Sequence, residues 1–493
     1  MHPLVPGLRV LPLPWEGVAK VLMVASEAVP FVKTGGLADV VGALAGALAA
    51  GGDEVAVVLP KYRLARIERI ERVFYDLKIW LGIDSYAVGV DSVSRGGVTY
   101  FFIDCPALYN RPGLYNERNE DYPDNHIRFA VLSRAALEIV RYLFRAQVVH
   151  CHDWQASLVA PYARHLFGGD PTFFNLRILL TIHNLGYQGI FPRAALAEMG
   201  LDGRVFEREG MEFYGQVNVL KGGIVWSDAI TTVSPTYARE IQSPENGFGL
   251  DGLLRTRASV LNGVLNGVDA VEWNPETDRH LRQPYSSRHL EGKQANKLAL
   301  LAEFGLPELA ERPLIGIVSR LADQKGFDLF ATIRDDLMAE DVALVTLGTG
   351  DPRYEEMFRD LARRYPGRAG VRIGYDNALA HRIEAGADIF LMPSRYEPCG
   401  LNQMYSLRYG TLPVVHATGG LNDTIDEGTG FKFREYSAPA LMTAIRAALA
   451  AFGDPDGWRE RVLRGMSKDF SWSQSASEYA ALYRRLLASA ETG

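Results

Sequence analysis

Short apolar runs alternate with longer, helix-like segments along most of the chain. Near the start, residues 21–25 have the pattern of a buried strand, residues 37–49 that of a helix, and residues 54–59 that of a second strand. The helix is expected to end at Gly51-Gly52, because glycine commonly terminates helices. This β-α-β order predicts a parallel sheet with helices on both faces. Further strand-like runs lie at residues 99–103, 148–151, 178–182 and 229–233.

The same alternation starts again near residue 314. It predicts strands at 314–319, 343–348, 371–374, 389–393 and 413–416, and helices at 327–337, 378–385, 403–409 and 473–487. Two such series in 493 residues indicate two domains of about 200–250 residues each. Two Asn-Gly turns within residues 261–269 mark the crossing between them. We therefore predict an N-terminal extension at 1–20, domains at 21–262 and 263–470, and a C-terminal helical segment at 471–493.

Composition and charge narrow the classes of function. Hydrophobic residues make up 47% of the chain and charged residues 23%, as in ordinary globular proteins, and the formal net charge is −7. That mild negative charge speaks against nucleic acid or an anionic membrane as a partner. No apolar run approaches the ~20 residues that span a bilayer, and residues 1–20 lack the pattern of a signal peptide. The three cysteines form no C-x-x-C pair, which favours a reducing, cytoplasmic location.

The first candidate for binding chemistry is the loop between the first strand and the first helix. It contains Lys33, Gly35 and Gly36. Glycines let the backbone approach a ligand closely, helix N–H groups favour an anion, and Lys33 adds positive charge. A simple glycine turn with a surface lysine explains the pattern equally well, since this is not the G-x-G-x-x-G fingerprint. The letters Thr-Gly-Gly-Leu-x-Asp recur at residues 418–423, again between a predicted strand and a predicted helix.

A second polar segment, His-Cys-His-Asp-Trp-Gln at residues 150–155, lies at a strand end, where open α/β sheets bind ligands. A neutral His152 that hydrogen-bonds a sugar hydroxyl is favoured over a metal ligand, because no third ligand is evident. The alternative is purely structural, with Asp153 capping a helix and Trp154 buried. Asp454-Pro-Asp456 is interpreted as a turn and not as a metal site. We therefore expect no metal and no other cofactor.

Charged residues follow two strands of the second series. Arg320 and Lys325 are five positions apart on one loop and can converge on a diphosphate, whose charge grows as it departs. Glu397, on the loop after another strand, is placed to face a sugar with developing positive charge. The alternative for the cations is solvated surface charge. Cys399 has no histidine base nearby in the sequence, so it is interpreted as lining the pocket and not as a nucleophile.

Eight motifs in this order resemble those of the bacterial glycogen synthases and the starch synthases, glycosyltransferase family five. The resemblance extends from residue 21 to about residue 483. The motifs are KTGGLADV at 33–40, HDW at 152–154, HNLGYQG at 183–189, TVSPTYAREI at 232–241, VLNGVD at 264–269, SRLADQKG at 319–326, EPCGLNQ at 397–403 and TGGLNDT at 418–424.

The resemblance implies an α/β protein with the GT-B fold, in which two Rossmann-like domains with parallel sheets face a deep inter-domain cleft. It implies transfer of glucose, with retention of configuration, from ADP-glucose to the non-reducing end of glycogen or another α-1,4-glucan. The C-terminal helix at 471–493 would pack back on the N-terminal domain, as in similar enzymes. Oligomeric state is not implied.

The resemblance also implies roles for individual residues. Lys33, in the loop with Gly35 and Gly36, would bind the sugar nucleotide, Arg320 and Lys325 the phosphates, and Glu397 would be the essential acid near the donor glucose. His152 would contact a glucose hydroxyl. The other residues implied to contact substrate are Asp39 and Asn266 in the cleft, Gly400 and Leu401 beside Cys399 at the sugar hydroxyls, and Thr418, Gly419 and Gly420 at the phosphates.

Three positions depart from the pattern of related transferases. Tyr405 stands where many of them carry a second glutamate, so Glu397 would act alone. Gln155 and Asn402 replace a common histidine and a common threonine beside the site. These polar replacements affect fine contacts with substrate.

Several alternatives stay open at this stage. The transferase could use UDP-glucose or a small acceptor, and substitution could proceed on one face of the sugar or through a covalent intermediate on Glu397. A glucan phosphorylase would need a pyridoxal phosphate lysine and a longer chain. A non-catalytic glucan-binding protein is disfavoured, because Lys33, Arg320, Lys325 and Glu397 are all present.

Overall fold

The computed structural model describes residues 17–118, 120–307 and 310–489. The chain forms two compact units. Unit 1 contains the described residues up to Thr232, the segment Ile241–Val264 and the C-terminal segment from Trp472. Unit 2 contains Val233–Glu240 and Leu265–Ser471. The short segment Val233–Glu240 therefore belongs to unit 2, although the residues on both sides of it belong to unit 1. The predicted domain boundaries do not include this exchange.

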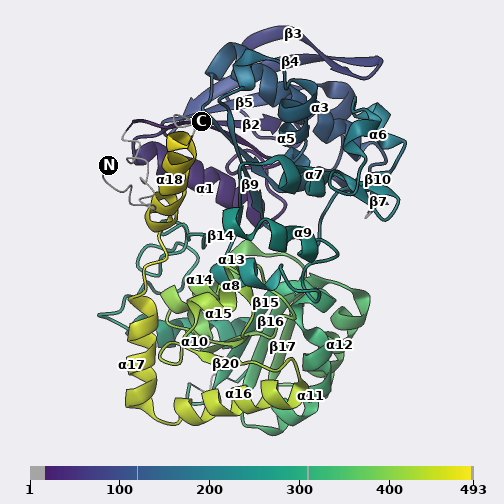
Figure 1. Ribbon diagram of the computed structural model, residues 1–493. Helices are drawn as coiled ribbons and strands as arrows, with labels where there is room; N and C mark the ends of the chain where they lie inside the picture. Colours follow the sequence, from purple (N-terminus) through teal and green to yellow (C-terminus); the bar gives the residue numbers. More distant parts are fainter. Residues whose placement is uncertain (1–16, 119, 308–309, 490–493) are drawn as a thin grey trace, which may run out of the picture. The chain divides into compact units, whose positions relative to one another are not determined.

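Unit 1 is built on a nine-stranded sheet with the order β14-β13-β9-β8-β1-β2-β5-β4-β3 (Figure 1). From β14 to β5 neighbouring strands are parallel, whereas β4 pairs antiparallel with both β5 and β3. The strands are β1 (Lys20–Val24), β2 (Glu54–Pro60), β3 (Glu71–Leu81), β4 (Asp84–Arg95), β5 (Val98–Asp104), β8 (Val148–His152), β9 (Arg177–Ile182), β13 (Ala229–Thr232) and β14 (Leu261–Gly263).

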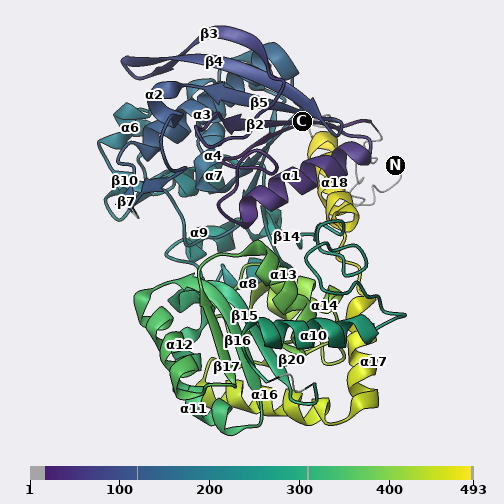
Figure 2. The same ribbon diagram turned by 180° about the vertical axis from the view of Figure 1, so that it is seen from behind.

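Helix α18 (Trp472–Ala488) packs beside α1 (Gly36–Ala50) in unit 1 (Figure 2). Their apolar side chains form one core with alternate residues of β1, β2 and β5. The other helices of unit 1 are α2 (Pro106–Tyr109), α3 (Asn125–Ile139), α4 (Asp153–Ala156), α5 (Val159–Pro161), α6 (Ala195–Glu198), α7 (Val219–Trp226) and α9 (Asp251–Thr256). Two small sheets complete this unit: β6 (Asn116–Glu117) with β7 (Glu120–Asp121), and β10 (Ile190–Pro192), β12 (Gln216–Asn218) and β11 (Glu212–Phe213).

Unit 2 has an all-parallel sheet of six strands in the order β17-β16-β15-β18-β19-β20. The strands are β15 (Leu314–Leu321), β16 (Ala343–Gly350), β17 (Ala369–Ile373), β18 (Ile389–Met392), β19 (Leu412–His416) and β20 (Phe431–Phe433). The side chains of the four central strands β16, β15, β18 and β19 are mostly buried on both faces, as expected for a parallel sheet.

Helices cover the sheet of unit 2 in two groups, each with its own apolar core. The first group is α10 (Glu291–Glu303) and α13 (Asn377–Gly386), and the second is α11 (Phe327–Ala339), α12 (Pro352–Arg364) and α16 (Ala438–Phe452). The remaining helices of the unit are α8 (Pro235–Glu240), α14 (Asn402–Arg408), α15 (Gly419–Thr424) and α17 (Pro455–Met466).

All of the strands and helices predicted from the apolar pattern are confirmed, and their ends lie within two residues of the predicted ones. The long β3–β4 hairpin was not predicted, and it makes the sheet of unit 1 mixed and not purely parallel. The predicted turn at Asp454-Pro-Asp456 is the start of α17, where the Asp454 carboxylate accepts a hydrogen bond from the Gly457 N–H. Across the described residues, no helix is long and apolar enough to cross a membrane.

Candidate active site

The carboxyl ends of the six parallel strands of unit 2 meet at one edge of the sheet. Ligands of open α/β sheets bind at such an edge. Arg320 lies at the end of β15, Glu397 follows β18, and Thr418 follows β19. The fold therefore gathers the candidate residues of this unit at one edge.

The central contact of this edge is an ion pair between Lys325 and Glu397. Lys325 Nζ lies 2.5 Å from Glu397 Oε2, and Ser394 Oγ donates a hydrogen bond to the same oxygen over 3.0 Å. The side chains of Lys325 and Glu397 are only 20% and 8% exposed. Ion pairs in such surroundings are screened less than surface pairs. Sequence reasoning did not identify Ser394.

Arg320 and Lys325 are connected through Gln324. Arg320 donates a hydrogen bond to Gln324 Oε1 over 3.3 Å, and the Gln324 carbonyl accepts one from the Arg395 N–H over 2.8 Å. The turn that carries Lys325 is therefore attached to the loop that carries Glu397. Arg320 is exposed, so its guanidinium can reach an anion.

Close backbone packing shapes the Glu397 loop. Gly419 and Gly420 lie directly against this loop, because a Cβ at either position would overlap the carbonyl oxygen of Glu397 or of Cys399. Gly400 has a φ of 71°, a conformation that favours glycine. Leu401 immediately precedes α14. These glycines place the loop that carries Glu397 tightly against the loop that begins at Thr418.

Cys399 and Asn266 are neighbours beneath this loop. Burial raises the pKa of the Cys399 thiol to about 12, although a hydrogen bond with the Asn266 backbone opposes the shift. A thiol with so high a pKa is a poor nucleophile, which agrees with the prediction that Cys399 is not the nucleophile; its place in a pocket stays a prediction. The Asn266 side chain is buried, and its Oδ1 has no hydrogen-bond partner among the described residues.

Tyr405, the position that carries a second glutamate in many related transferases, is part of an aromatic stack. Its ring lies 3.8 Å from that of Trp273, whose other face stacks on His381 at 3.8 Å. The side chain is buried. A carboxylate at this position would lose this stacking, and Tyr405 supplies no acid to the site.

The loop from Thr418 to Gly420 has an internal carboxylate as its partner. The Thr418 hydroxyl donates to Glu240 over 3.0 Å, and the Gly419 N–H donates to the same carboxylate over 3.1 Å. The Gly420 N–H donates to the backbone carbonyls of Glu397 and Pro398. The expectation that this loop holds phosphates stays a prediction; the Thr418 hydroxyl and the Gly419 and Gly420 N–H groups already have partners within the protein.

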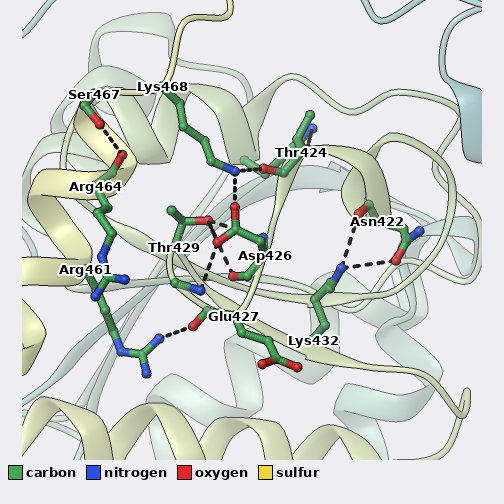
Figure 3. Close-up of polar contacts among 12 residues, drawn as sticks. Asn422, Thr424, Asp426, Glu427, Thr429, Lys432, Arg461, Arg464, Ser467 and Lys468 are labelled. Atoms are coloured by element: carbon green, nitrogen blue, oxygen red, sulfur yellow. Dashed lines mark hydrogen bonds and ion pairs between the residues drawn. The ribbon is translucent and has the colours of Figure 1, made fainter.

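The far end of the same segment is also fixed (Figure 3). Lys432 Nζ donates to the carbonyl and side-chain oxygens of Asn422, each over 3.2 Å. Lys468 Nζ donates to the Thr424 carbonyl over 2.7 Å and forms an ion pair with Asp426 at 2.6 Å. Together with Glu240, these contacts hold α15 at both of its ends.

In unit 1, the loop from Lys33 to Gly36 joins β1 to α1. Lys33 forms an ion pair with Asp39 at 2.8 Å, and both side chains are partly exposed. The buried carboxylate of Glu27 accepts hydrogen bonds from the Thr34 hydroxyl and from the Thr34 and Gly35 N–H groups. These two amides are therefore not free for an anion, and Lys33 itself is the positive group that the loop offers.

The structure brings the histidines at the ends of β8 and β9 together. His152 is buried, and its Nδ1 lies 3.0 Å from Nε2 of the partly buried His183. The Nε2 of His152 has no hydrogen-bond partner among the described residues. Burial lowers the pKa of His183 to about 3 and that of His152 well below its usual value, so both imidazoles are neutral. The contact of His152 with a glucose hydroxyl stays a prediction, and His183 is a second neutral histidine beside it.

Asp153 and Trp154 have structural partners as well. The Asp153 carboxylate accepts a hydrogen bond from the His183 N–H over 2.7 Å, and burial raises its pKa to about 7. Trp154 packs against Phe129 and Phe191. Asp153 therefore orients the backbone of His183.

Sequence reasoning also missed Tyr375, which follows β17 at the carboxyl edge of unit 2. It is 82% exposed, and among the residues of this unit that the structure describes it is the one exposed aromatic side chain. An exposed ring at a ligand-binding edge can stack on a flat ligand. An aromatic residue directly after a strand is the sequence signal that could have identified it.

In the described part of the chain, no group of three or more His, Cys, Asp or Glu side chains is arranged to hold a metal ion. The cations named above are the groups available to neutralise an anionic ligand. The expectation that the reaction needs no metal stays a prediction.

Two protein-family models match the chain. The model for the starch synthase catalytic domain matches residues 20–256, and the model for glycosyl transferases group 1 matches residues 303–461. A glycogen synthase from Koribacter versatilis is 49% identical over 94% of this chain and 97% of its own length. A glycogen synthase from Anaeromyxobacter sp. (strain Fw109-5) is 50% identical over 95% of this chain and all of its own length.

Solved structures of related proteins have the same fold. The catalytic domain of starch synthase IV from Arabidopsis thaliana, bound to ADP and acarbose, is 33% identical, with a TM-score of 0.87 over 96% of this chain and 100% of that chain. A sucrose-phosphate synthase from Thermosynechococcus elongatus, 18% identical with a TM-score of 0.60, shares the fold. The two-domain α/β architecture of the GT-B class is confirmed. The chain therefore belongs to the glycogen synthase and starch synthase family of glycosyltransferases.

Proposed function

We propose that the protein is a glycogen synthase that transfers glucose from ADP-glucose to the non-reducing end of an α-1,4-glucan, with retention of configuration and release of ADP. Its relatives are glycogen synthases at about half identity over nearly their whole length, and a related starch synthase binds ADP. The observation that carries the proposal is the close pair of Lys325 and Glu397 beside the exposed Arg320, at the ligand-binding edge of unit 2.

The cations act on the leaving group. As the bond between glucose and diphosphate breaks, negative charge grows on the diphosphate, and preorganised cations stabilise it where it develops. Arg320 and Lys325 supply this charge without a metal ion. The ring of Tyr375 stacks on the nucleotide base, and Lys33 adds a positive contact to the sugar nucleotide. ADP-glucose and a glucan are thus the only partners that the reaction needs.

Glu397 and His183 act on the sugar. Glu397 is held by Lys325 and Ser394, so its carboxylate is fixed beside the glucose that gains positive charge. His183 and the adjoining His152 are both neutral, and we assign the contact with a glucose hydroxyl to this pair. The acceptor hydroxyl attacks from the face that the diphosphate leaves and gives its proton to a phosphate oxygen.

A comparison of donors tests this proposal. Initial rates of ADP or UDP release are measured with ADP-glucose or UDP-glucose as donor and glycogen as acceptor. We expect ADP-glucose to be the faster donor and release to require the glucan. A faster reaction with UDP-glucose would show a different glucosyltransferase, and binding of glycogen without any release would show a glucan-binding protein.

A further inference from the structure

Glu27 is a buried carboxylate with an unusual set of partners. It is 3% exposed, and within the described residues it forms no ion pair. Its oxygens accept hydrogen bonds from the Thr34 N–H, from the Thr34 hydroxyl over 2.9 Å, from the Gly35 N–H over 3.3 Å and from the Tyr115 hydroxyl over 2.8 Å. A buried carboxylate is costly unless its lone pairs are satisfied, and here four donors satisfy it.

These bonds fix the backbone on which Lys33 stands. Thr34 directly follows Lys33, and Gly35 immediately precedes α1. A backbone hydrogen bond from the Val29 N–H to the Ala38 carbonyl, 3.0 Å long, closes the other side of the loop. The Lys33 side chain itself is 47% exposed. The ammonium group, which pairs with Asp39 at 2.8 Å, is therefore carried on a backbone that Glu27 holds in place.

Unit 2 repeats the arrangement with different residues. Glu240 accepts hydrogen bonds from the Thr418 hydroxyl and the Gly419 N–H, as Glu27 does from the hydroxyl of Thr34 and the N–H of Gly35. Glu27 precedes its loop by seven residues, whereas Glu240 lies 178 residues before Thr418. The two carboxylates make the same contact although they lie at very different distances in sequence from their loops. This indicates that each Thr-Gly-Gly loop requires a carboxylate partner.

We propose that Glu27 is a positioning residue for the donor, which acts by holding the Lys33 loop in the conformation that binds the sugar nucleotide. This inference rests on the proposed function. Since Glu27 engages the amides of Thr34 and Gly35, an anionic donor meets the side chain of Lys33 and not these amides. Loss of the Glu27 carboxylate frees the loop, so Lys33 must be ordered again each time the donor binds.

The test is a double-mutant cycle with Glu27→Gln and Lys33→Ala. Glutamine keeps the size of the side chain but replaces one accepting oxygen with an amide that faces donors. With glycogen saturating, kcat and the KM for ADP-glucose are measured for wild type, both single variants and the double variant. We expect Glu27→Gln alone to lower kcat/KM about tenfold, mainly by raising KM. In the Lys33→Ala background, the same change should lower kcat/KM by less than about twofold, because the residue that Glu27 positions is already gone.

Two further variants separate positioning from general damage. Thr34→Val removes only the hydroxyl that donates to Glu27, and it is expected to raise the KM for ADP-glucose by less than Glu27→Gln does. This variant keeps the test valid if Glu27→Gln does not fold. Glu138→Gln alters another buried glutamate of unit 1, which pairs with Arg141, and should leave both constants within about twofold of wild type. Thermal unfolding of every variant is recorded alongside.

The outcomes are distinct. The positioning role would be overturned if Glu27→Gln lowered kcat/KM equally in the wild-type and Lys33→Ala backgrounds, or if it lowered kcat alone. A Thr34→Val enzyme with an unchanged KM would contradict it as well. If Lys33→Ala leaves the KM for donor unchanged while glucose is still transferred, both Lys33 and Glu27 lose their roles but the proposed function stands. If wild type transfers no glucose from ADP-glucose, the proposed function itself fails, and this inference with it.

Discussion

Lys325 and Glu397 form an ion pair, and this pairing sets what each can do. The carboxylate of Glu397 is buried, so without Lys325 the Ser394 hydroxyl would be the donor left to it among the described residues. In the proposed reaction, a diphosphate beside Arg320 meets a lysine already aimed by Glu397. In that reaction Lys325 serves both the acid and the leaving group.

Replacement of Lys325 by alanine tests this sharing. We expect Lys325→Ala to lower turnover at saturating donor by about 10²–10³-fold, the usual loss for one preorganised electrostatic donor. Arg446→Ala is the matched control, since it removes an exposed cation of the same unit that pairs with Glu340. Turnover near wild type in Lys325→Ala, or an equal loss in Arg446→Ala, would contradict the assignment.

The two Thr-Gly-Gly loops differ in how they tolerate a side chain. Gly419 has a φ of 45°, and a Cβ there would overlap the Glu397 carbonyl oxygen, whereas at Gly35 nothing lies within 4 Å of that position. We expect Gly419→Ala to destabilise unit 2 by about 1–3 kcal/mol, and Gly35→Ala to leave the unfolding temperature unchanged. Differential scanning calorimetry of the two variants checks this contrast. Equal unfolding temperatures would show that the Glu397 loop can move away.

Single residues were predicted unevenly from the sequence. Lys325 and Glu397 could be identified, because charge directly after a strand of a parallel sheet is a strong signal for a site. Glu27 and Glu240 could not, because nothing in the sequence shows which carboxylate reaches a distant loop. His183 could not be ranked against His152, because the residue pattern does not show how deeply each imidazole is buried.

At the scale of elements, strand β8 carries two buried histidines that pack against β9 and the residues after it. The rings of His150 and His152 lie 4.1 Å apart, and His150 bonds to Thr181 of β9 and to Tyr483 of α18. Burial lowers the pKa of His150 to about 3. These strands are therefore built around imidazoles that stay neutral when the protein is folded.

That neutrality predicts a pH dependence of stability. In the unfolded chain His150 takes up a proton as the pH falls below about 6.5, whereas the folded form does not until about pH 3. The stability of the folded form should therefore fall between pH 6.5 and 5 by up to about 1.4 kcal/mol per pH unit for this group. The free energy of unfolding is measured by denaturant for wild type and His150→Gln at several pH values. It should change less steeply with pH in the variant than in wild type. His289→Gln, at an exposed histidine, should keep the wild-type slope, and equal slopes in all three proteins would contradict the prediction.

Elements buried on both faces were predicted well, because continuous apolar runs identify them. The β3–β4 hairpin was missed, since its strands mix exposed and buried positions around irregular pairing between Arg72 and Leu77. For α15, the sequence predicted the helix but not the contacts that hold it. Its glycines mark a helix start, but its contacts with Lys432 and Lys468 come from residues later in the chain.

At the scale of the whole molecule, the chain returns to unit 1 at its end. Helix α18 contributes Trp472, Tyr479, Tyr483 and three leucines to the core that it shares with α1. Residues 472–488 are thus part of the first unit, although the second unit precedes them in sequence. The sequence predicted this helix, but its packing partner was implied only by resemblance.

This return of the chain predicts that a change in α18 affects unit 1 alone. Tyr483→Ala removes a fully buried ring and its hydrogen bond to His150, and should destabilise unit 1 by about 3–5 kcal/mol. Hydrogen exchange should show lost protection in β1 and α1, with β15 and β16 unchanged. Ser477→Ala, at an exposed position of the same helix, should alter neither unit. Equal loss of protection in both units would contradict this division.

The most direct test of the central claim is to follow the glucose itself. The protein is incubated with ADP-glucose labelled in the sugar and with a maltooligosaccharide, and the linkage and position of the label in the product are determined by NMR. We predict one labelled glucose at the non-reducing end, in an α-1,4 bond, with one ADP released for each. Label in a β-linkage, at the reducing end or only in free glucose would contradict it.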